Sequence, residues 1–355
     1  MLADLARRAD ERVVAFDLFG DLDLRRSAER VVTGGGLAAL VDAAAAEPAS
    51  RVVYGAGFEN HPGLVERLAE RHALLGNAPA ALRAVRDPAR LGATLRDAGF
   101  AYPRTFAAAP PEPSGRWLRK PLRGGGGTRV RAWRGGALPA GTIVQERIVG
   151  LACSAAAVAD GADAVVLGIT EQLVGRRAFG VRGHRWCGNV VPPRLPAGER
   201  AALLEQARAI CSYLGGAFAL RGLFGVDLIW DGGRAWTLEV NPRPTASLEA
   251  IEAAHGIKAF DAHLRGCAGD LPSIDATRPG AAGKAVLFAT EDVTIGDSER
   301  WLERGVRDVP HPGERIAAGR PVCTLVTMAK DPLGALERQA ARVRAELRVE
   351  VRADG

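Results

Sequence analysis

Two apolar runs flank an Asp-Gly-Gly turn in the stretch Gly222-Leu-Phe-Gly-Val-Asp227-Leu-Ile-Trp-Asp-Gly-Gly-Arg-Ala-Trp-Thr-Leu-Glu239-Val-Asn241-Pro-Arg243-Pro-Thr-Ala-Ser247. An Asp-Gly pair between two such runs predicts a β-hairpin. Glu239 and Asn241 lie two residues apart on its second strand, so their side chains leave the sheet on the same face. A turn with an odd number of residues brings Asp227 onto that face as well.

The predicted face carries the ligand chemistry of a magnesium site. Two carboxylates and an amide oxygen are hard-oxygen ligands that Mg²⁺ takes while it keeps positions for water and phosphates. A solvated hairpin face would explain these three residues alone. The flanking positions are apolar, however, and unpaired carboxylates in a core hairpin are costly. Asp227, Glu239 and Asn241 are therefore the predicted metal ligands, and the prolines on either side of Arg243 hold it near them.

A second motif combines a lysine with a glycine run. The predicted strand around Trp117 to Pro121 delivers Lys120, and Gly124 to Gly127 follow. Glycine lets backbone N–H groups approach phosphate oxygens, and the ammonium offsets their charge. A flexible loop would explain the glycines but not a lysine that is one of four in a chain with 47 basic residues. No Gly-Lys-Ser/Thr follows, so this is not a Walker motif.

The order of these motifs, Lys-Pro with glycines and then Asp followed by Glu-x-Asn-x-Arg, resembles the ATP-grasp superfamily, including predicted ATP-dependent carboligases. The resemblance implies that Lys120 reaches the nucleotide phosphates and that the glycines form the flap over them. The run from Thr142 to Gly150 resembles the hinge that holds adenine. The implied ATP-binding residues are Lys120, Gly124, Gly125, Gly126, Gly127, Gln145, Glu146, Arg147 and Ile148.

The resemblance also implies a reaction. An ATP-grasp ligase passes the γ-phosphate of ATP to a carboxylate, and an amine attacks the acyl phosphate to form an amide. The implied cofactors are ATP and one or two Mg²⁺ ions, with Mn²⁺ as a substitute. Lys120 and Arg243 are the catalytic candidates, because fixed positive charge stabilises a transferring phosphoryl group. Ser247, Glu59 and Asp17 are the substrate candidates, the last two because they follow early strands.

The first domain, with its turn from Gly55 to Asn60, and the Glu-Val-Asn-Pro-Arg-Pro-Thr-x-Ser segment that ends at Ser247 resemble small ligases of one-carbon cofactor biosynthesis. These include ligases that join glutamate to tyramine or tyrosine in methanofuran-type coenzymes. Two other readings stay open. One is a carboxylase that works through carboxyphosphate. The other is an ATP-binding sensor or scaffold without turnover.

Composition excludes several classes of protein. The 355 residues are 47% hydrophobic and 25% charged, and no apolar run reaches the ~20 residues of a membrane span. Five cysteines without a C-x-x-C pair indicate reduced thiols in a cytoplasm, and we expect no signal peptide. The net charge of +6 is spread along the chain, which argues against nucleic acid. Small carboxylates and amines are the expected partners, and a homodimer stays open.

The predicted fold class is α/β (α+β), an ATP-grasp fold with a small α/β domain before it and a C-terminal β extension after it. The predicted boundaries are 1–87 for the first domain, 88–270 for the ATP-grasp module and 271–355 for the extension with a closing helix at 331–347. Within the module we expect a nucleotide lobe at about 115–180, completed by strands at 153–159 and 164–174, and a metal lobe at about 181–270. Strands are also expected at 13–19, 51–54 and 307–313, and a helix at 199–214.

Overall fold

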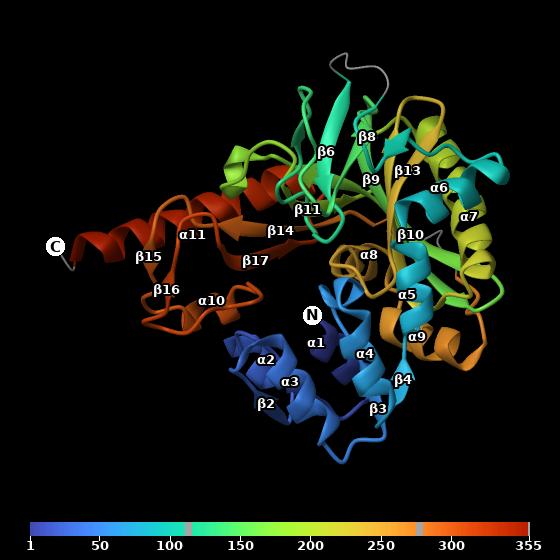
Figure 1. The fold of residues 1–355 in the computed structure, drawn as a ribbon. Helices are drawn as coiled ribbons and strands as arrows, with labels where there is room; N and C mark the ends of the chain where they lie inside the picture. Colours follow the sequence, from blue (N-terminus) through green and yellow to red (C-terminus); the bar gives the residue numbers. More distant parts are fainter. Residues whose placement is uncertain (111–115, 275–279, 354–355) are drawn as a thin grey trace.

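The computed structural model of the protein describes residues 1–110, 116–274 and 280–353. It has the mixed α/β architecture that the sequence predicts, with a small N-terminal part packed below a large sheet and a long C-terminal helix beside that sheet (Figure 1). No helix among the described residues is both long and apolar enough to cross a membrane.

The N-terminal part alternates strands and helices. Strand β1 pairs with β2 and β3 pairs with β4, both in parallel, as expected for a small α/β unit. The first strand is shorter than the predicted 13–19, because a turn begins at Asp17. The elements are α1 Leu2–Arg7, β1 Val14–Phe16, α2 Leu22–Ser27, β2 Arg30–Val32, α3 Gly36–Ala45, β3 Arg51–Val53, η1 Phe58–Asn60, α4 Pro62–Ala69 and β4 Ala73–Leu75.

Two helices and a four-stranded antiparallel sheet follow. Asp87 caps the second helix, since its carboxylate accepts hydrogen bonds from the backbone N–H groups of Ala89 and Arg90, and Pro88 occupies the first helical turn. The sheet has the order β5-β8-β6-β7 and carries Lys120 on β6. The elements are α5 Pro79–Val85, α6 Pro88–Asp97, β5 Thr105–Phe106, β6 Trp117–Pro121, β7 Arg131–Ala132 and β8 Thr142–Glu146.

The large sheet has seven strands in the order β13-β12-β9-β10-β11-β14-β17. The expectation that residues 153–159 and 164–174 complete the nucleotide-side sheet is wrong, because β9 pairs with β12 of the predicted metal hairpin and with β10. The strands are β9 Leu151–Asp160, β10 Ala164–Val174, β11 Trp186–Val191, β12 Arg221–Trp230, β13 Ala235–Asn241, β14 Ala282–Phe288 and β17 Pro321–Thr327.

Small side chains let helices cover both faces of the central strand β9. Ala155, Ala157 and Ala159 belong to the core beneath helix α7, whereas Ala156 and Val158 belong to the core beneath α8 and α9. Alternate residues of a strand face opposite sides, so a strand buried on both faces is apolar throughout. The helices around this sheet are η2 Arg177–Phe179, α7 Ala197–Ala217, α8 Leu248–His255 and α9 Ala259–Ala268.

The C-terminal part completes the sheet and closes it with the predicted helix. Its further elements are β15 Val293–Thr294, α10 Glu299–Glu303, β16 Arg315–Ile316 and α11 Pro332–Ala353. The strand predicted at 307–313 is wrong. Arg307 forms a single bridge with Thr324, and Asp308 has a φ of 49°, which ends the extended conformation. The prolines at 310 and 312 also lack the N–H groups that a ladder needs.

Candidate active site

The hairpin of β12 and β13 brings the predicted metal ligands together. Asp227 lies directly opposite Glu239, and Gly225 lies opposite Asn241. A bulge follows Asp227, where the register shifts. Gln172 on β10 donates from Nε2 to Asp227 Oδ1 at 2.8 Å. Sequence patterns did not point to Gln172, because one polar residue in an apolar strand has no specific signature.

The two carboxylates form an acidic pair in which Asp227 is half-buried and the Glu239 side chain is 39% exposed. Burial, and then the charge of Glu239, raise the pKa of Asp227 from 3.8 to about 7. A divalent cation would relieve this repulsion, so the pair fits Mg²⁺. The set has only two carboxylates, and no group of three His, Cys, Asp or Glu suited to a metal occurs in the part of the chain that the structure describes.

Asn241 takes a different position from the one expected of a metal ligand. Its Nδ2 faces Asp227 Oδ2 at 3.4 Å, while its Oδ1 accepts from Arg243 Nη2 at 3.3 Å. The amide would have to rotate to share a cation with Asp227. Its role as a third ligand therefore stays a prediction.

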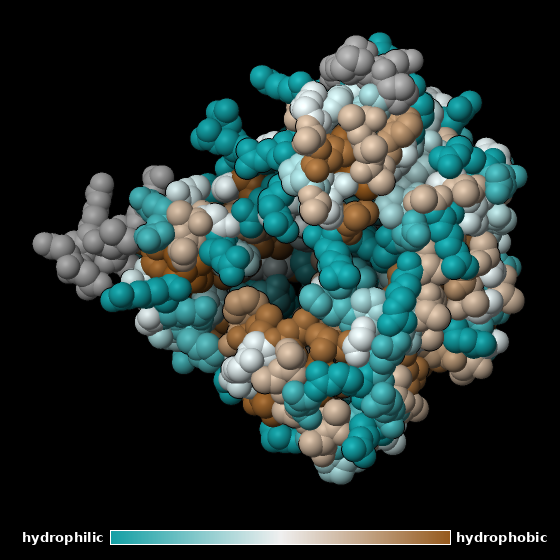
Figure 2. All heavy atoms as spheres, in the orientation of Figure 1, coloured by the Kyte–Doolittle hydropathy of each residue, from teal (hydrophilic) through white to brown (hydrophobic). Residues whose placement is uncertain are grey.

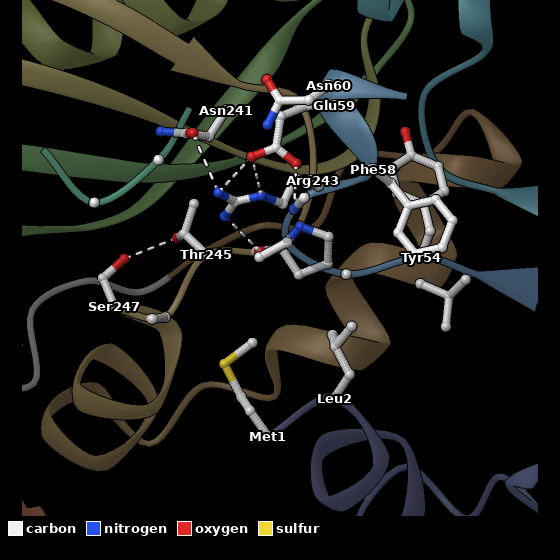
Figure 3. Close-up of a pocket in the computed structure, with 18 of the residues that line it drawn as sticks. Met1, Leu2, Tyr54, Phe58, Glu59, Asn60, Asn241, Arg243, Thr245 and Ser247 are labelled. Atoms are coloured by element: carbon white, nitrogen blue, oxygen red, sulfur yellow. Dashed lines mark hydrogen bonds and ion pairs between the residues drawn. The ribbon is translucent and has the colours of Figure 1, made fainter. Parts of the chain in front are cut away.

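Arg243 forms a buried ion pair with Glu59, which comes from the turn after β3 (Figure 3). Glu59 Oε1 accepts from Arg243 Nε at 3.1 Å and from Nη2 at 2.9 Å. Their side chains are only 2% and 12% exposed, so water screens the pair weakly. Burial acts to raise the pKa of Glu59, but Arg243 outweighs it and the pKa is lowered. The N-terminal part thus fixes the arginine near the acidic pair of Asp227 and Glu239.

A second contact joins the N-terminal part to this hairpin. Asn77, which is 1% exposed, donates to the carbonyl of Pro242 at 3.0 Å and accepts from the N–H of Arg221 at 2.8 Å. Tyr54 donates to the carbonyl of Asn77 at 2.7 Å. Asn77 therefore ties both ends of the hairpin to the chain after β4, and no sequence motif indicated this.

Lys120 lies on the other side of the site. Its Nζ donates to Gln145 Oε1 at 2.5 Å, so two of the predicted ATP-binding residues contact each other. Burial lowers the pKa of Lys120, while the charges of Glu239 and Asp227 oppose that shift. A half-buried ammonium near two carboxylates is suited to an anionic ligand that brings its own cation.

The glycine loop is closed over the site. The carbonyl of Gly126 accepts from the N–H of Trp186 at 3.0 Å, and that of Gly124 accepts from Arg86 Nη2 at 3.4 Å. Gly127 has a φ of +67°, and a Cβ there would lie 1.8 Å from the carbonyl oxygen of His184. Only glycine fits this approach. Arg86 also pairs with Glu239 at 3.4 Å, so it connects the loop to the acidic pair.

The remaining candidates lie around one large cavity. Glu146, Arg147 and Ile148 line it, and Glu146 forms an ion pair with Arg104 at 3.1 Å. Ser247 lines it too and hydrogen-bonds Thr245 at 2.8 Å (Figure 3).

Asp17 lies elsewhere along the same cavity, where its carboxylate accepts from the N–H groups of Phe19 and Gly20. The cavity has a volume of about 1790 Å³ and reaches from the glycine loop into the N-terminal part. Figure 2 shows the hollowed face, with apolar residues on its lower wall. It has room for a nucleotide and a second ligand.

Comparisons with known proteins identify the kind of domain that contains this site. Residues 85–247 match the family model described as an ATP-grasp domain. The formate-dependent phosphoribosylglycinamide formyltransferase of Methylococcus capsulatus is 29% identical over 170 residues, which are 47% of this chain and 42% of that protein. The enzyme of the same name from Burkholderia vietnamiensis is 34% identical over 128 residues, 36% of this chain and 30% of that protein. The matches thus span less than half the length of these curated relatives.

Solved structures match along nearly the whole chain. The N5-carboxyaminoimidazole ribonucleotide synthetase from Thermus thermophilus has a TM-score of 0.70 at 21% identity, with coverage of 98% of this chain and 95% of that one. The biotin carboxylase complex from Campylobacter jejuni has a TM-score of 0.69 at 16% identity, with coverage of 95% and 86%. These likenesses establish the fold.

Proposed function

Because residues 85–247 of this chain form an ATP-grasp domain, we propose that the protein is an ATP-dependent ligase that joins a carboxylate to an amine through an acyl phosphate. The observation that carries this proposal is the pair of facing carboxylates Asp227 and Glu239, which shares one cavity with Lys120 and Arg243. A protein that only binds ATP has no need of Arg243 beside the metal pair.

Each part of the site has a role in this reaction. Lys120 and the glycine loop would hold the phosphate tail, and Asp227 with Glu239 would hold Mg²⁺, with Asn241 as a further candidate. Bound Mg²⁺ offsets the negative charge of the phosphates. The side chains themselves do no covalent chemistry, because phosphoryl transfer depends mainly on positioning and charge.

The two steps balance without a further reactant. A carboxylate oxygen attacks the γ-phosphorus, the bond to the bridging oxygen breaks, and ADP leaves with that electron pair. The neutral amine nitrogen then attacks the acyl carbon, the carbon–oxygen bond to phosphate breaks, and inorganic phosphate leaves. The proton that the nitrogen loses passes to solvent. Arg243 would stabilise the charge that develops on the transferring group, and its ion pair with Glu59 would hold it in position.

The substrates form the finer part of the proposal. L-Glutamate leads the candidate carboxylates, and tyramine or tyrosine leads the amines, as in methanofuran-type coenzyme biosynthesis. Ser247, Glu59 and Asp17 are the proposed substrate contacts, since all three line the cavity. Bicarbonate is the simplest carboxylate that the site could activate, and it represents the carboxylase alternative.

Trapping the acyl phosphate tests the proposal. The protein is incubated with Mg-ATP, hydroxylamine as a surrogate amine, and single carboxylates that include L-glutamate and bicarbonate. The proposal predicts that one acid yields a hydroxamate and ADP, and that Glu239→Ala abolishes both. ADP release with bicarbonate alone would favour carboxylation. Tight ATP binding without ADP release with any acid would favour the sensor reading.

A further inference from the structure

Arg86 occupies a fixed position between two helices. It follows the last residue of α5, and the next residue, Asp87, caps α6. Leu82 and Val85 anchor α5 in the core, and the carboxylate of Asp87 accepts two backbone hydrogen bonds from the first turn of α6. These contacts hold the backbone of Arg86, while its side chain reaches the candidate active site.

The guanidinium of Arg86 lies between the glycine loop and the acidic pair. Its Nη2 donates to the carbonyl of Gly124 at 3.4 Å, and its Nη1 donates to Glu239 Oε2 at 3.4 Å. Both partners line the large cavity. Arg86 therefore contacts the loop that would hold the phosphates and a carboxylate that would hold the metal at the same time.

These contacts satisfy the guanidinium poorly. Its side chain is only 13% exposed, and Nε is shielded from water without a hydrogen-bond partner among the described residues. A good N–H···O bond has a length of about 2.9 Å, so the contacts to Gly124 and Glu239 are weak. A shielded cation with weak partners and an unpaired donor favours an anion that can approach it closely.

Arg86 also balances the charge of the acidic pair. Asp227 and Glu239 carry two negative charges when both are ionised. Arg86 pairs with Glu239, and Lys120 lies near both carboxylates, so these two cations match that charge. A divalent cation that arrives without a nucleotide therefore meets little net attraction, and at Glu239 it is repelled by Arg86.

Bound phosphates would change this balance. A polyphosphate chain at the glycine loop would offset the charge of Arg86 and leave Glu239 available to a metal. We propose that Arg86 is a positioning residue that makes metal binding depend on the nucleotide. In the empty site it holds Glu239 beside the loop, and it gives Glu239 up to the metal once phosphates are bound. This inference rests on the proposed function for the roles of the loop and the carboxylates, and it is independent of the substrates.

The affinity for each ligand alone tests this role. Arg86→Met removes the charge that competes with the metal, so Mn²⁺ without nucleotide should bind at least about tenfold more tightly at pH 8 by electron paramagnetic resonance. The same variant lacks a cation beside the phosphates, so ADP in EDTA should bind at least about tenfold more weakly by calorimetry. Weaker binding of both ligands, as a purely structural role predicts, or an unchanged affinity for either one, would overturn the proposal.

Three further variants serve as controls. Arg90→Met removes a cation from an exposed position on α6, where the guanidinium lies over the ring of Phe218, and should change neither affinity. Arg86→Lys keeps the positive charge and should return both affinities to within about threefold of the wild type. If Arg86→Met fails to fold, Arg86→Gln, which loses the charge but keeps a polar donor, should show the same opposite shifts.

The site of the metal is checked with a double variant. Adding Glu239→Ala to Arg86→Met should remove the gain in Mn²⁺ affinity, because that carboxylate is the one that Arg86 occupies. A gain that persists without Glu239 would place the metal elsewhere and would overturn the inference.

Two outcomes separate this inference from the proposed function. Hydroxamate formation by the wild type, together with shifts of the same sign for both ligands in Arg86→Met, would overturn the role of Arg86 and leave the ligase proposal standing. A wild type that binds neither ADP nor Mn²⁺ with ADP would overturn both.

Discussion

Replacing Glu239 by glutamine should stabilise the metal-free protein above neutral pH. Burial and then the charge of Glu239 raise the pKa of Asp227 from its ordinary value of 3.8 to about 7. A pKa raised by about 3 corresponds to on the order of 4 kcal/mol of lost stability once Asp227 is ionised in both states. Because the folded-state pKa is the higher one, this cost grows as the pH rises from about 4 and is complete above about 7.

Only part of that cost belongs to Glu239, because burial is the larger cause. We expect Glu239→Gln to gain about 1–2 kcal/mol at pH 8, less a few tenths for the lost pair with Arg86. At pH 5 Asp227 is protonated in the folded wild type, so little repulsion is left to remove, and the two proteins should differ by no more than the few tenths of a kcal/mol of the pair with Arg86. Urea unfolding at pH 5 and pH 8 measures both values.

Magnesium should reverse the order of stability. At a concentration of about 100 times its dissociation constant, a ligand of the folded state adds about 2.7 kcal/mol. The wild type should gain this stability in Mg²⁺ at pH 8, and Glu239→Gln should gain little. A variant that is less stable than the wild type at pH 8 without metal, or an equal difference at both pH values, would refute this account of the pair.

Three further variants and one control variant test the surroundings of the site. Glu59→Gln removes the charge that faces buried Arg243 and should cost about 3 kcal/mol in urea unfolding; the difference should shrink as the pH falls through the lowered pKa of Glu59, and a pH-independent difference would contradict the ion pair. Gly127→Ala should weaken ATP binding about tenfold by calorimetry, whereas Gly125→Ala, with open space around it, should not. Asn77→Leu leaves buried partners unsatisfied and should lower stability by about 1–3 kcal/mol; an unchanged Tm would show that the contact does not hold the hairpin.

The hairpin could be predicted from a local rule, but its register at the site could not. The pairing set by the Asp-Gly-Gly turn, with Trp230 opposite Ala235 and Leu228 opposite Thr237, would put Asp227 opposite Leu238. The bulge between Asp227 and Leu228 shifts the register by one residue and brings Asp227 opposite Glu239. The helix at 199–214 was predicted from its apolar period, and the structure extends it only slightly. Pairing between distant strands has no such local signal, which is why the sequence alone places β9 and β10 in the wrong sheet.

Individual site residues could be predicted only as far as their chemistry shows in the sequence. Lys120 and the glycines stand out by type and spacing, and Arg243 stands out through its flanking prolines. Asn77 and Gln172 do not, because their roles depend on backbone groups and side chains that only the tertiary fold brings to them. The pairing of Arg243 with Glu59 joins residues 184 positions apart, and no spacing rule reaches that far.

Transfer of ¹⁸O from the carboxylate tests the central claim most directly. The acid that yields a hydroxamate is labelled with ¹⁸O in its carboxyl group and allowed to react with Mg-ATP and an amine, and the released phosphate is examined by mass spectrometry. An acyl phosphate predicts one ¹⁸O atom in each phosphate that is formed, together with ADP and an amide. Phosphate that carries oxygen from water instead would contradict the proposed reaction.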